Sequence, residues 1–422
     1  MTAFIVLIFS SRVIESEASV GFRPKTPYNL TMNYRKDKHG DDISILGYGC
    51  MRFTTKAGKI DIPKATCEIK LAIDNGVNYF DTAYIYPGSE AALGQILEEN
   101  GWRDKVKIAT KLPQYLVGNN PKALDKFFEE EKKRLRTDYV DYYLMHHLTD
   151  VSAWNKLKAV GAREWLEAKR EAGEIRNIGF SYHGDTEGFL GILNDYDWDF
   201  CQIQYNYMDE NTQAGVIGLK AAAQKGVPVI IMEPLRGGKL AELPSGAKSI
   251  LAKDTKGRSA PRLAFEWLWN QPEVTCVLSG MNSEEMVLEN VKTASEVQAG
   301  CFTDEDFKLI EGIKEEIRKT TKVNCTGCRY CMPCPKGVDI PGVFRCYNHM
   351  YSEGKSTGWR EFMQSIALQD KPGLPSLCVQ CGKCEKHCPQ NIEIIKTLKE
   401  ADRKLEPWYM KIAIKIGRKF VL

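Results

Sequence analysis

Apolar and polar residues alternate along this chain with two different periods. Short apolar runs are typical of buried strands, whereas longer stretches repeat an apolar residue every three or four positions, as one face of a helix does. The runs predict eight strands, at residues 43–49, 77–82, 105–110, 139–146, 175–181, 200–206, 227–234 and 274–280. Helix-like stretches, such as residues 123–136 and 186–196, lie in most of the intervals between these strands.

Strands that alternate with helices in this way predict an α/β fold. Eight strand–helix units between residues 42 and 320 fit a (β/α)8 TIM barrel, in which parallel strands close into a cylinder. A doubly wound parallel sheet with the same number of strands is the alternative.

Eight of the 14 cysteines fall into two runs near the end of the chain. The runs comprise Cys325, Cys328, Cys331 and Cys334, followed by Cys378, Cys381, Cys384 and Cys388. The second run has the C-x2-C-x2-C-x3-C-P spacing with which bacterial ferredoxins bind [4Fe–4S] clusters. In that arrangement three thiolates bind one cluster, and the cysteine before the proline binds the other. The two runs therefore predict two [4Fe–4S] clusters.

The ferredoxin spacing also predicts which cysteines act together. One cluster is expected on Cys325, Cys328, Cys331 and Cys388, and the other on Cys378, Cys381, Cys384 and Cys334. Only two residues separate Cys331 from Cys334, which is one fewer than usual and leaves the partner of Cys334 open. Structural zinc is the alternative metal, and Cys346 is either a spare ligand or a buried thiol.

Four segments follow from these patterns. They are an N-terminal extension over residues 1–31, a barrel over 32–320, a small ferredoxin-like and mostly α-helical iron–sulfur domain over 321–400, and a basic amphipathic tail over 401–422. Met32 is a more natural start than Met1, so the extension is an addition or a misplaced start. The tail either packs on the body as a helix or lies on an anionic membrane or a partner.

Composition narrows the range of partners. Charge is nearly balanced, with 58 basic and 55 acidic residues, so no broad basic field favours nucleic acid. No apolar run approaches the roughly 20 residues of a transmembrane segment. The apolar run near the start has no basic residue before it, unlike a secretory signal. Because cysteine-bound clusters need a reducing compartment, a cytoplasmic location is expected.

The carboxyl ends of barrel strands are where reactive residues gather. Asp81 and Tyr86 follow the second predicted strand, Lys111 follows the third, and His146 ends the fourth. Each has an ordinary structural explanation alone, but together they can converge on one oxygen atom. They predict proton donation to a carbonyl, with Tyr86 as the acid and Lys111 lowering its pKa. Asp81 would hold the ammonium group, and His146 would orient the carbonyl.

Several segments resemble those that bear the catalytic tetrad and cofactor site of the aldo/keto reductases. They read DTAYIYPGSE, IATKLP, DYYLMHH and GEIRNIGFS. Residues 33–398 are similar to the subgroup with a ferredoxin-like C-terminal domain, through LGYGCMRF, MEPLRGGKL and CTGCRYCMPCPKGVDIP. The resemblance implies an oxidoreductase that reduces a small aldehyde or ketone with NADH or NADPH. It places the tetrad on Asp81, Tyr86, Lys111 and His146.

The same resemblance implies the residues that bind the nicotinamide cofactor. Ser181 and Gln202 fall on the positions that hold the carboxamide, and the backbone near Cys50 and Met51 approaches the cofactor. The pyrophosphate, adenosine and adenine contacts fall on Leu235, Gly237, Gly280, Asn282, Glu289 and Asn290.

Four positions depart from the family pattern. Tyr182 stands where many members have asparagine, and Met232 stands where an aromatic residue commonly stacks on the nicotinamide. Gly280 and Met286 replace the cations that clamp the 2′-phosphate of NADPH. Because charge-assisted pairs with phosphate are the strong ones, NADH fits as well as NADPH.

The clusters and the nicotinamide do not exchange electrons easily, because hydride carries two electrons and a cluster passes one. No flavin signature is visible, although a bound flavin would bridge the two. Three hypotheses follow: the clusters are structural or regulatory, they carry electrons from a ferredoxin-like partner, or the barrel is an inactive cofactor-binding module that senses redox state.

Overall fold

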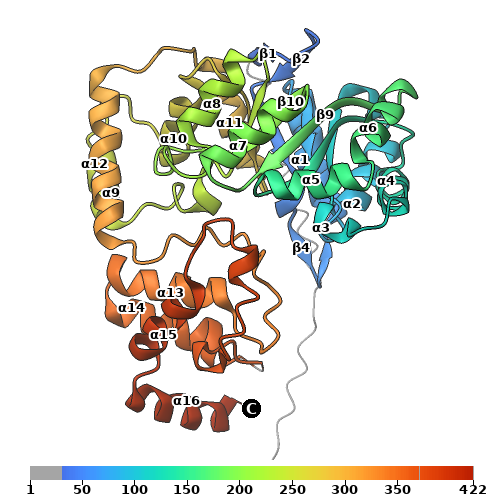
Figure 1. The fold of residues 1–422 in the computed structure, drawn as a ribbon. Helices are drawn as coiled ribbons and strands as arrows, with labels where there is room; N and C mark the ends of the chain where they lie inside the picture. Colours follow the sequence, from blue (N-terminus) through green and yellow to red (C-terminus); the bar gives the residue numbers. More distant parts are fainter. Residues whose placement is uncertain (1–30, 370, 422) are drawn as a thin grey trace, which may run out of the picture. The chain divides into compact units, whose positions relative to one another are not determined.

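Eight parallel strands close into a barrel in the computed structural model, which describes residues 31–369 and 371–421 (Figure 1). The strands are β3 (Leu46–Gly49), β6 (Tyr79–Asp81), β7 (Lys107–Leu112), β8 (Val140–Leu148), β9 (Ile175–Tyr182), β10 (Phe200–Gln204), β11 (Val229–Met232) and β12 (Val274–Ser279). The last strand, β12, pairs in parallel with the first, β3. This closure confirms the TIM barrel and excludes an open doubly wound sheet.

Helices connect successive strands on the outside of the barrel (Figure 1). They include α1 (Ile62–Asp74), α2 (Ser89–Glu99), α4 (Lys122–Leu135), α6 (Ala162–Glu171), α7 (Thr186–Asp195), α8 (Gly215–Gln224), α10 (Ala260–Trp269) and α11 (Glu284–Glu296). Several of these helices follow a residue whose side chain accepts a hydrogen bond from a backbone N–H group of the first turn, such as Asp185 before α7 and Ser283 before α11. These caps satisfy N–H groups that the first helical turn leaves free.

The first predicted strand, residues 43–49, is in fact two strands. β2 (Asp42–Ser44) pairs antiparallel with β1 (Tyr34–Lys36), and the barrel strand β3 begins only at Leu46. Ile43 is fully buried against inward-facing side chains of the barrel, including Tyr79 and Phe200. Its burial in this core gives the segment the same apolar pattern as a continuous strand, so the sequence does not reveal the break.

The C-terminal region is mostly helical, as expected. Its helices are α13 (Ile340–Ser352), α14 (Lys355–Phe362), α15 (Ile394–Leu405) and α16 (Trp408–Val421), which lie together in orange to red in Figure 1. They share one apolar core, and six cysteines of the two runs pack against it. The long helix α12 (Asp304–Thr320) precedes this region and packs beside α9 (Ser245–Leu251) of the barrel part.

The predicted tail is continuous with this helical region. Helix α15 runs through the expected boundary at residues 400 and 401. In α16, Ile414 is buried in the shared core and Met410 packs against it, whereas Trp408 is 75% exposed. The tail up to residue 415 therefore packs on the body, and the side chains beyond it lie outside the described residues.

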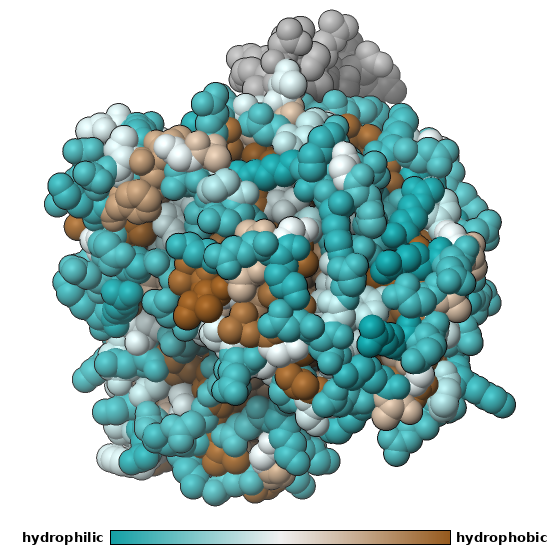
Figure 2. Space-filling view, turned by 45° about the horizontal axis from the view of Figure 1, so that its top comes forward, coloured by the Kyte–Doolittle hydropathy of each residue, from teal (hydrophilic) through white to brown (hydrophobic). Residues whose placement is uncertain are grey.

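The surface gives little sign of a membrane-spanning element. No helix within residues 31–369 and 371–421 combines the length and apolar character that crossing a bilayer needs. The face shown in Figure 2 is largely hydrophilic, with apolar residues in small separate patches. The expected N-terminal extension falls, apart from residue 31, outside the described residues.

Candidate active site and iron–sulfur sites

A buried ion pair joins the ends of β6 and β7. Lys111 Nζ lies 2.7 Å from both Asp81 Oδ1 and Asp81 Oδ2, and 2.6 Å from the carbonyl oxygen of Thr82. These contacts use all three N–H groups of the ammonium, and both charged side chains are almost fully buried. Burial raises the pKa of the Asp81 carboxyl, and Lys111 opposes this rise. A buried pair of this kind holds its geometry because its hydrogen bonds are satisfied.

Tyr86 and His146 adjoin this pair, so the structure brings all four predicted tetrad residues together. Lys111 Nζ lies 5.2 Å from the centre of the Tyr86 ring. The Tyr86 and His146 rings meet edge to face, with their centres 6.1 Å apart. The four side chains come from three neighbouring strands and the loop after β6, as expected for the carboxyl end of a barrel.

The surroundings of Tyr86 raise its pKa overall, although Lys111 was expected to lower it. Burial raises the pKa of Tyr86 well above its ordinary value, and the neighbouring Tyr330 and Asp81 raise it further. Lys111 directs its N–H groups to Asp81 and Thr82 and lies over the Tyr86 ring, and the net pKa of Tyr86 stays raised despite this nearby charge. The Tyr86 hydroxyl is therefore protonated at neutral pH, the form that an acid requires.

A bulge in β8 turns two successive histidines toward the same region. The pairing of β8 with β9 shifts between Met145 and Leu148, and His147 has a left-handed φ of 59°. In a regular strand, successive side chains point to opposite faces, and a bulge removes that alternation locally. Both His146 and His147 therefore have ring contacts with Tyr330, at centre distances of 6.4 and 5.1 Å.

His183 adds a third imidazole that the sequence interpretation missed. It follows β9, and its ring centre lies 4.7 Å from that of His147. Burial lowers the pKa of His147 to about 4, and it lowers those of His146 and His183 well below the ordinary value. All three rings are therefore neutral at pH 7. A neutral His146 can donate or accept one hydrogen bond at its Nε2 atom, depending on its tautomer.

Tyr330 reaches the same site from the C-terminal region, and the sequence interpretation missed it as well. It lies between Cys328 and Cys331. The cysteine spacing alone accounts for this loop, so the sequence gives no reason to assign Tyr330 a role in the active site. Its hydroxyl lies 3.5 Å from His146 Nε2, and it is close enough to Tyr86 to raise the pKa of that residue. No rule about strand ends could have found a residue that joins the site from a segment after the barrel.

The loop after β11 meets the first cysteine loop directly. Thr326 Oγ1 donates to Glu233 Oε1 at 3.4 Å, while Glu233 Oε2 is buried without a hydrogen-bond partner in the described structure. Burial raises the pKa of Glu233 to about 7. A Cβ atom on Gly237 would lie 1.9 Å from the carbonyl oxygen of Thr326, so only glycine fits this approach.

The two residues expected to hold the carboxamide are both buried near the tetrad. Ser181 Oγ accepts a hydrogen bond from the backbone N–H of His147 at 2.8 Å. Gln202 is close enough to Asp81 to lower the pKa of that carboxyl, and its Oε1 atom is buried with no partner among the described residues. This free acceptor fits the amide N–H group of a nicotinamide, which would satisfy it.

The remaining cofactor candidates are spread around the barrel mouth. Cys50 is buried and Met51 exposed in η1 (Cys50–Arg52) after β3, while Leu235 and Gly237 belong to the loop after β11. Gly280 and Asn282 follow β12, and Asn282 accepts a hydrogen bond from Thr54 Oγ1 at 3.4 Å. On α11, Glu289 accepts from Ser259 and Asn290 donates to Ser279 Oγ. The contacts of Glu289 and Asn290 are thus within the protein.

Arg52 supplies a cation that the sequence comparison missed. A Cβ atom on Gly280 would lie 3.2 Å from Arg52 Cδ, so this side chain crosses the turn after β12. Arg52 is exposed and forms no ion pair with another described residue. The Arg52 side chain therefore lies beside Gly280, the position at which the family resemblance leads us to expect a phosphate-binding cation, although it comes from η1.

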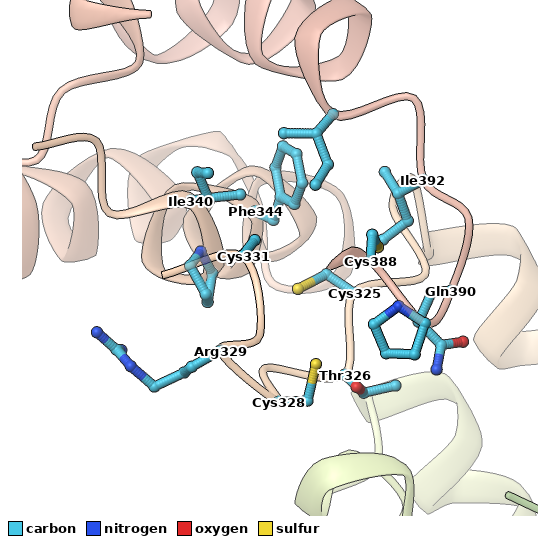
Figure 3. Close-up of a pocket in the computed structure, with 13 residues that line it drawn as sticks. Cys325, Thr326, Cys328, Arg329, Cys331, Ile340, Phe344, Cys388, Gln390 and Ile392 are labelled. Carbon is cyan, nitrogen blue, oxygen red and sulfur yellow. The ribbon is translucent and has the colours of Figure 1, made fainter. Parts of the chain in front are cut away.

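The eight cysteines surround two hollows in the sets that the ferredoxin spacing predicts. Cys325, Cys328, Cys331 and Cys388 line one, in which Figure 3 shows the sulfur atoms of Cys325 and Cys328 pointing inward. Cys334, Cys378, Cys381 and Cys384 line the other. No three described His, Cys, Asp or Glu side chains converge on a point suited to one ion. Four thiols around a hollow fit a cube, whose corner irons lie apart.

Cys346 belongs to neither hollow. It lies on α13 in the apolar core, and its Sγ atom lies 3.8 Å from Ser365 Oγ. Burial raises the pKa of its thiol to about 11. It is a core residue in this structure.

A larger cavity of about 520 Å³ lies beside the tetrad, between the barrel and the helical region. His147 and Tyr115 line it from the barrel, while Tyr330 lines it from the cysteine loop. Cys331 and Cys384, one cysteine from each set, also line it. Tyr330 and His147 thus connect this cavity to the tetrad.

Comparison with known proteins agrees with this geometry. The sequence model of the aldo/keto reductase family matches residues 45–315, and that of a 4Fe-4S dicluster domain matches residues 324–393. L-Galactose dehydrogenase from Arabidopsis thaliana is 27% identical over 310 residues, which cover 67% of this chain and 94% of that protein. A probable voltage-gated potassium channel subunit beta from Oryza sativa subsp. japonica is 25% identical over 332 residues, which cover 69% of this chain and 99% of that protein.

A solved structure is similar in fold. The aldo/keto reductase from Klebsiella pneumoniae in complex with NADP and acetate has a TM-score of 0.55 and 23% identity, over 67% of this chain and 95% of that one. The family match covers well over half of the sequence. This chain is therefore an oxidoreductase that belongs to the aldo/keto reductase family and carries a C-terminal 4Fe–4S dicluster domain.

Proposed function

We propose that the protein reduces an aldehyde or ketone with NADPH or NADH. The observation that carries this proposal is the meeting of Tyr86, His146 and the buried Asp81–Lys111 pair at one end of the barrel. Tyr86 is the proton donor to the carbonyl oxygen. His146, which is neutral, donates a second hydrogen bond to that oxygen through Nε2 in the appropriate tautomer.

Lys111 and Asp81 have a supporting role. As the carbonyl is reduced, negative charge develops on its oxygen and passes to Tyr86 as the proton leaves. A fixed ammonium near the Tyr86 ring stabilises that charge, and Asp81 keeps the ammonium in place. The raised pKa of Tyr86 keeps its hydroxyl protonated until a substrate oxygen accepts the proton.

The nicotinamide is expected across the barrel mouth. Gln202 Oε1 and Ser181 Oγ would hold its carboxamide, and Arg52 would bind phosphate oxygens near Gly280. When bound, the cofactor supplies the hydride. The Klebsiella structure contains NADP. In this chain Arg52 would supply the positive charge that Gly280 and Met286 do not provide after the eighth strand, and it would pair with the phosphates of either NADPH or NADH.

We propose that each hollow holds one [4Fe–4S] cluster and that the first one fixes part of the barrel mouth. Residues next to its ligand candidates contact the barrel: Thr326 bonds with Glu233, and the carbonyl oxygen of Pro389 accepts from Gln213 Nε2 at 2.7 Å. The cluster would therefore hold the loops that complete the active site.

Steady-state kinetics of anaerobically purified protein test the proposal. A panel of aldehydes and ketones is offered with NADPH and with NADH, and oxidation of the dinucleotide is followed. Tyr86→Phe should lower kcat by ~10²–10⁴-fold because the proton donor is lost. Tyr84→Phe is the matched control, since the Tyr84 hydroxyl bonds to Glu130 outside the tetrad. Equal activity in Tyr86→Phe and the native protein would refute the assignment.

Electron transfer from a ferredoxin-like partner is the second candidate function. The contacts between the first cysteine loop and the barrel favour it, because they bring one cluster site to the active site. Adding NADPH or NADH to the anaerobic protein and recording the cluster absorbance separates the two. Bleaching would support electron exchange, directly or through a bound flavin detected in the same sample. Unchanged absorbance during carbonyl turnover would exclude it as part of that reaction.

A further inference from the structure

An oxygen atom of the protein itself meets the two groups that the reaction needs. The Tyr330 hydroxyl lies 3.5 Å from His146 Nε2, and Tyr330 is near enough to Tyr86 to raise its pKa. In the proposed reaction, a substrate carbonyl oxygen has to contact these same two groups. Two oxygen atoms cannot occupy one position, so the hydroxyl and a substrate compete for it.

The backbone of Tyr330 is tied to the first cysteine set. Cys328 and Cys331 flank it, and both line the same hollow. Gly327 has a φ of 73°, a left-handed conformation that suits glycine and helps the loop turn. A cluster bound by these cysteines would fix the backbone on both sides of Tyr330, so that only its side chain is left to move.

The ring of Tyr330 stands between the tetrad and the large cavity. Its centre lies 5.1 Å from that of His147 and 6.1 Å from that of His183. It also lines the cavity of about 520 Å³, whose lining residues do not include Tyr86. A molecule in the cavity therefore reaches Tyr86 by passing Tyr330.

We propose that Tyr330 occupies the carbonyl-oxygen position in the resting protein and determines which substrates reach Tyr86. This inference rests on the proposed carbonyl reduction and adds a specificity-determining residue from the iron–sulfur domain. A substrate displaces the Tyr330 hydroxyl, and its carbonyl oxygen takes over the contacts with Tyr86 and His146. The displaced ring then forms the wall toward the cavity and disfavours bulky carbonyl compounds.

Two variants separate the hydroxyl from the ring. Tyr330→Phe removes the competing hydrogen bond, which is worth about 1 kcal/mol, so KM for a small aldehyde should fall ~5-fold while kcat stays within ~2-fold. Tyr330→Ala joins the cavity to the tetrad. The ratio of kcat/KM for a bulky aromatic ketone to that for the small aldehyde should rise by ~10–100-fold.

A matched control and an iron count accompany both variants. Tyr351→Phe changes an exposed tyrosine of α13 that does not line the cavity, and its kinetic constants should equal those of the native protein. A role of Tyr330 in packing alone would lower activity toward all substrates together. An unchanged substrate ratio in Tyr330→Ala at native iron content would overturn the proposal. A large fall in kcat for Tyr330→Phe at unchanged KM would also overturn it, because Tyr330 would then be a proton donor.

A binding experiment keeps this inference separate from the proposed reductase activity. Acetate offers a carboxylate oxygen to Tyr86 and His146 without being reduced, and calorimetry gives its Kd. Tyr330→Phe should bind acetate ~5-fold more tightly than the native protein, because no hydroxyl competes. Equal Kd values would overturn the inference even if carbonyl turnover is observed. If no carbonyl is reduced but acetate binding improves as expected, the proposed function fails and the competition by Tyr330 stands.

Discussion

At the scale of single residues, charge and burial define the site. Lys111 is 1% exposed and Asp81 is 3% exposed, so each charge depends on the other for compensation. Glu233 is different, because one of its carboxylate oxygens is buried without a partner and its pKa is raised to about 7. Asp81 and Glu233 are therefore expected to respond differently to substitution and to pH.

Lys111→Met should destabilise the protein strongly. It leaves the buried Asp81 without its counter-ion, a change that typically costs about 3–5 kcal/mol. Lys107→Met is the control, because Lys107 pairs with the exposed Asp41 and such surface pairs contribute about 1 kcal/mol or less. Anaerobic thermal unfolding, followed by circular dichroism, measures both. Similar melting temperatures for the two variants would contradict the assigned importance of the buried pair.

Glu233 should make stability fall as pH rises. Its folded pKa of about 7 lies above the ordinary value of 4.5, so the folded state binds the proton more tightly than the unfolded state. The resulting loss begins near pH 4.5 and is complete above pH 7, at about 3 kcal/mol. Glu233→Gln should therefore raise the melting temperature more at pH 8 than at pH 5. A gain independent of pH would show that the carboxyl titrates normally.

At the scale of elements, the barrel strands were predictable because their apolar runs record burial on both faces. The sequence could not show that the first run divides at Ile45, since Ile43 is buried in the same core. It also could not show the bulge in β8. His146 and His147 are adjacent in sequence, so a regular strand would place their side chains on opposite faces. Only the shifted pairing with β9 reveals that both contact Tyr330.

The bulge in β8 predicts a difference between two substitutions of one residue. His147 has a left-handed φ of 59°, which asparagine tolerates and a β-branched residue does not. His147→Val should lower stability by about 1–3 kcal/mol and weaken activity by moving His146. His147→Asn should keep the melting temperature close to the native value. If both variants melt alike, the backbone strain at this position does not matter.

At the scale of the whole molecule, two regions far apart in the sequence build one site. The tetrad positions and the cysteine sets were predictable from local spacing and from the family resemblance. Tyr330, Thr326 and Gln390 were not, because nothing local indicates that residues beside the cysteines contact the barrel. Gln390 Nε2 donates to Gln204 Oε1 at 2.6 Å, a contact across 186 residues of sequence. Such long-range contacts arise only when the two regions pack.

The cysteine sets can be tested by combining substitutions. Cys325→Ala and Cys388→Ala should each remove the same cluster, so the double variant should lose no more than the ~4 irons of either single variant. Cys325→Ala combined with Cys378→Ala should lose ~8 irons, because these cysteines line different hollows. Cys346→Ala is the control and should keep all the iron. Additive losses for Cys325 and Cys388 would contradict the crossed sets.

Transfer of deuterium from nicotinamide to product tests the central claim most directly. NADPH or NADH labelled with deuterium at C4 is incubated with a carbonyl substrate and the anaerobic protein, and the alcohol is examined by mass spectrometry. The account predicts one deuterium on the former carbonyl carbon, and at least ~100-fold less labelled alcohol with Tyr86→Phe. Alcohol without deuterium, or equal labelling by Tyr86→Phe, would contradict hydride transfer at this tetrad.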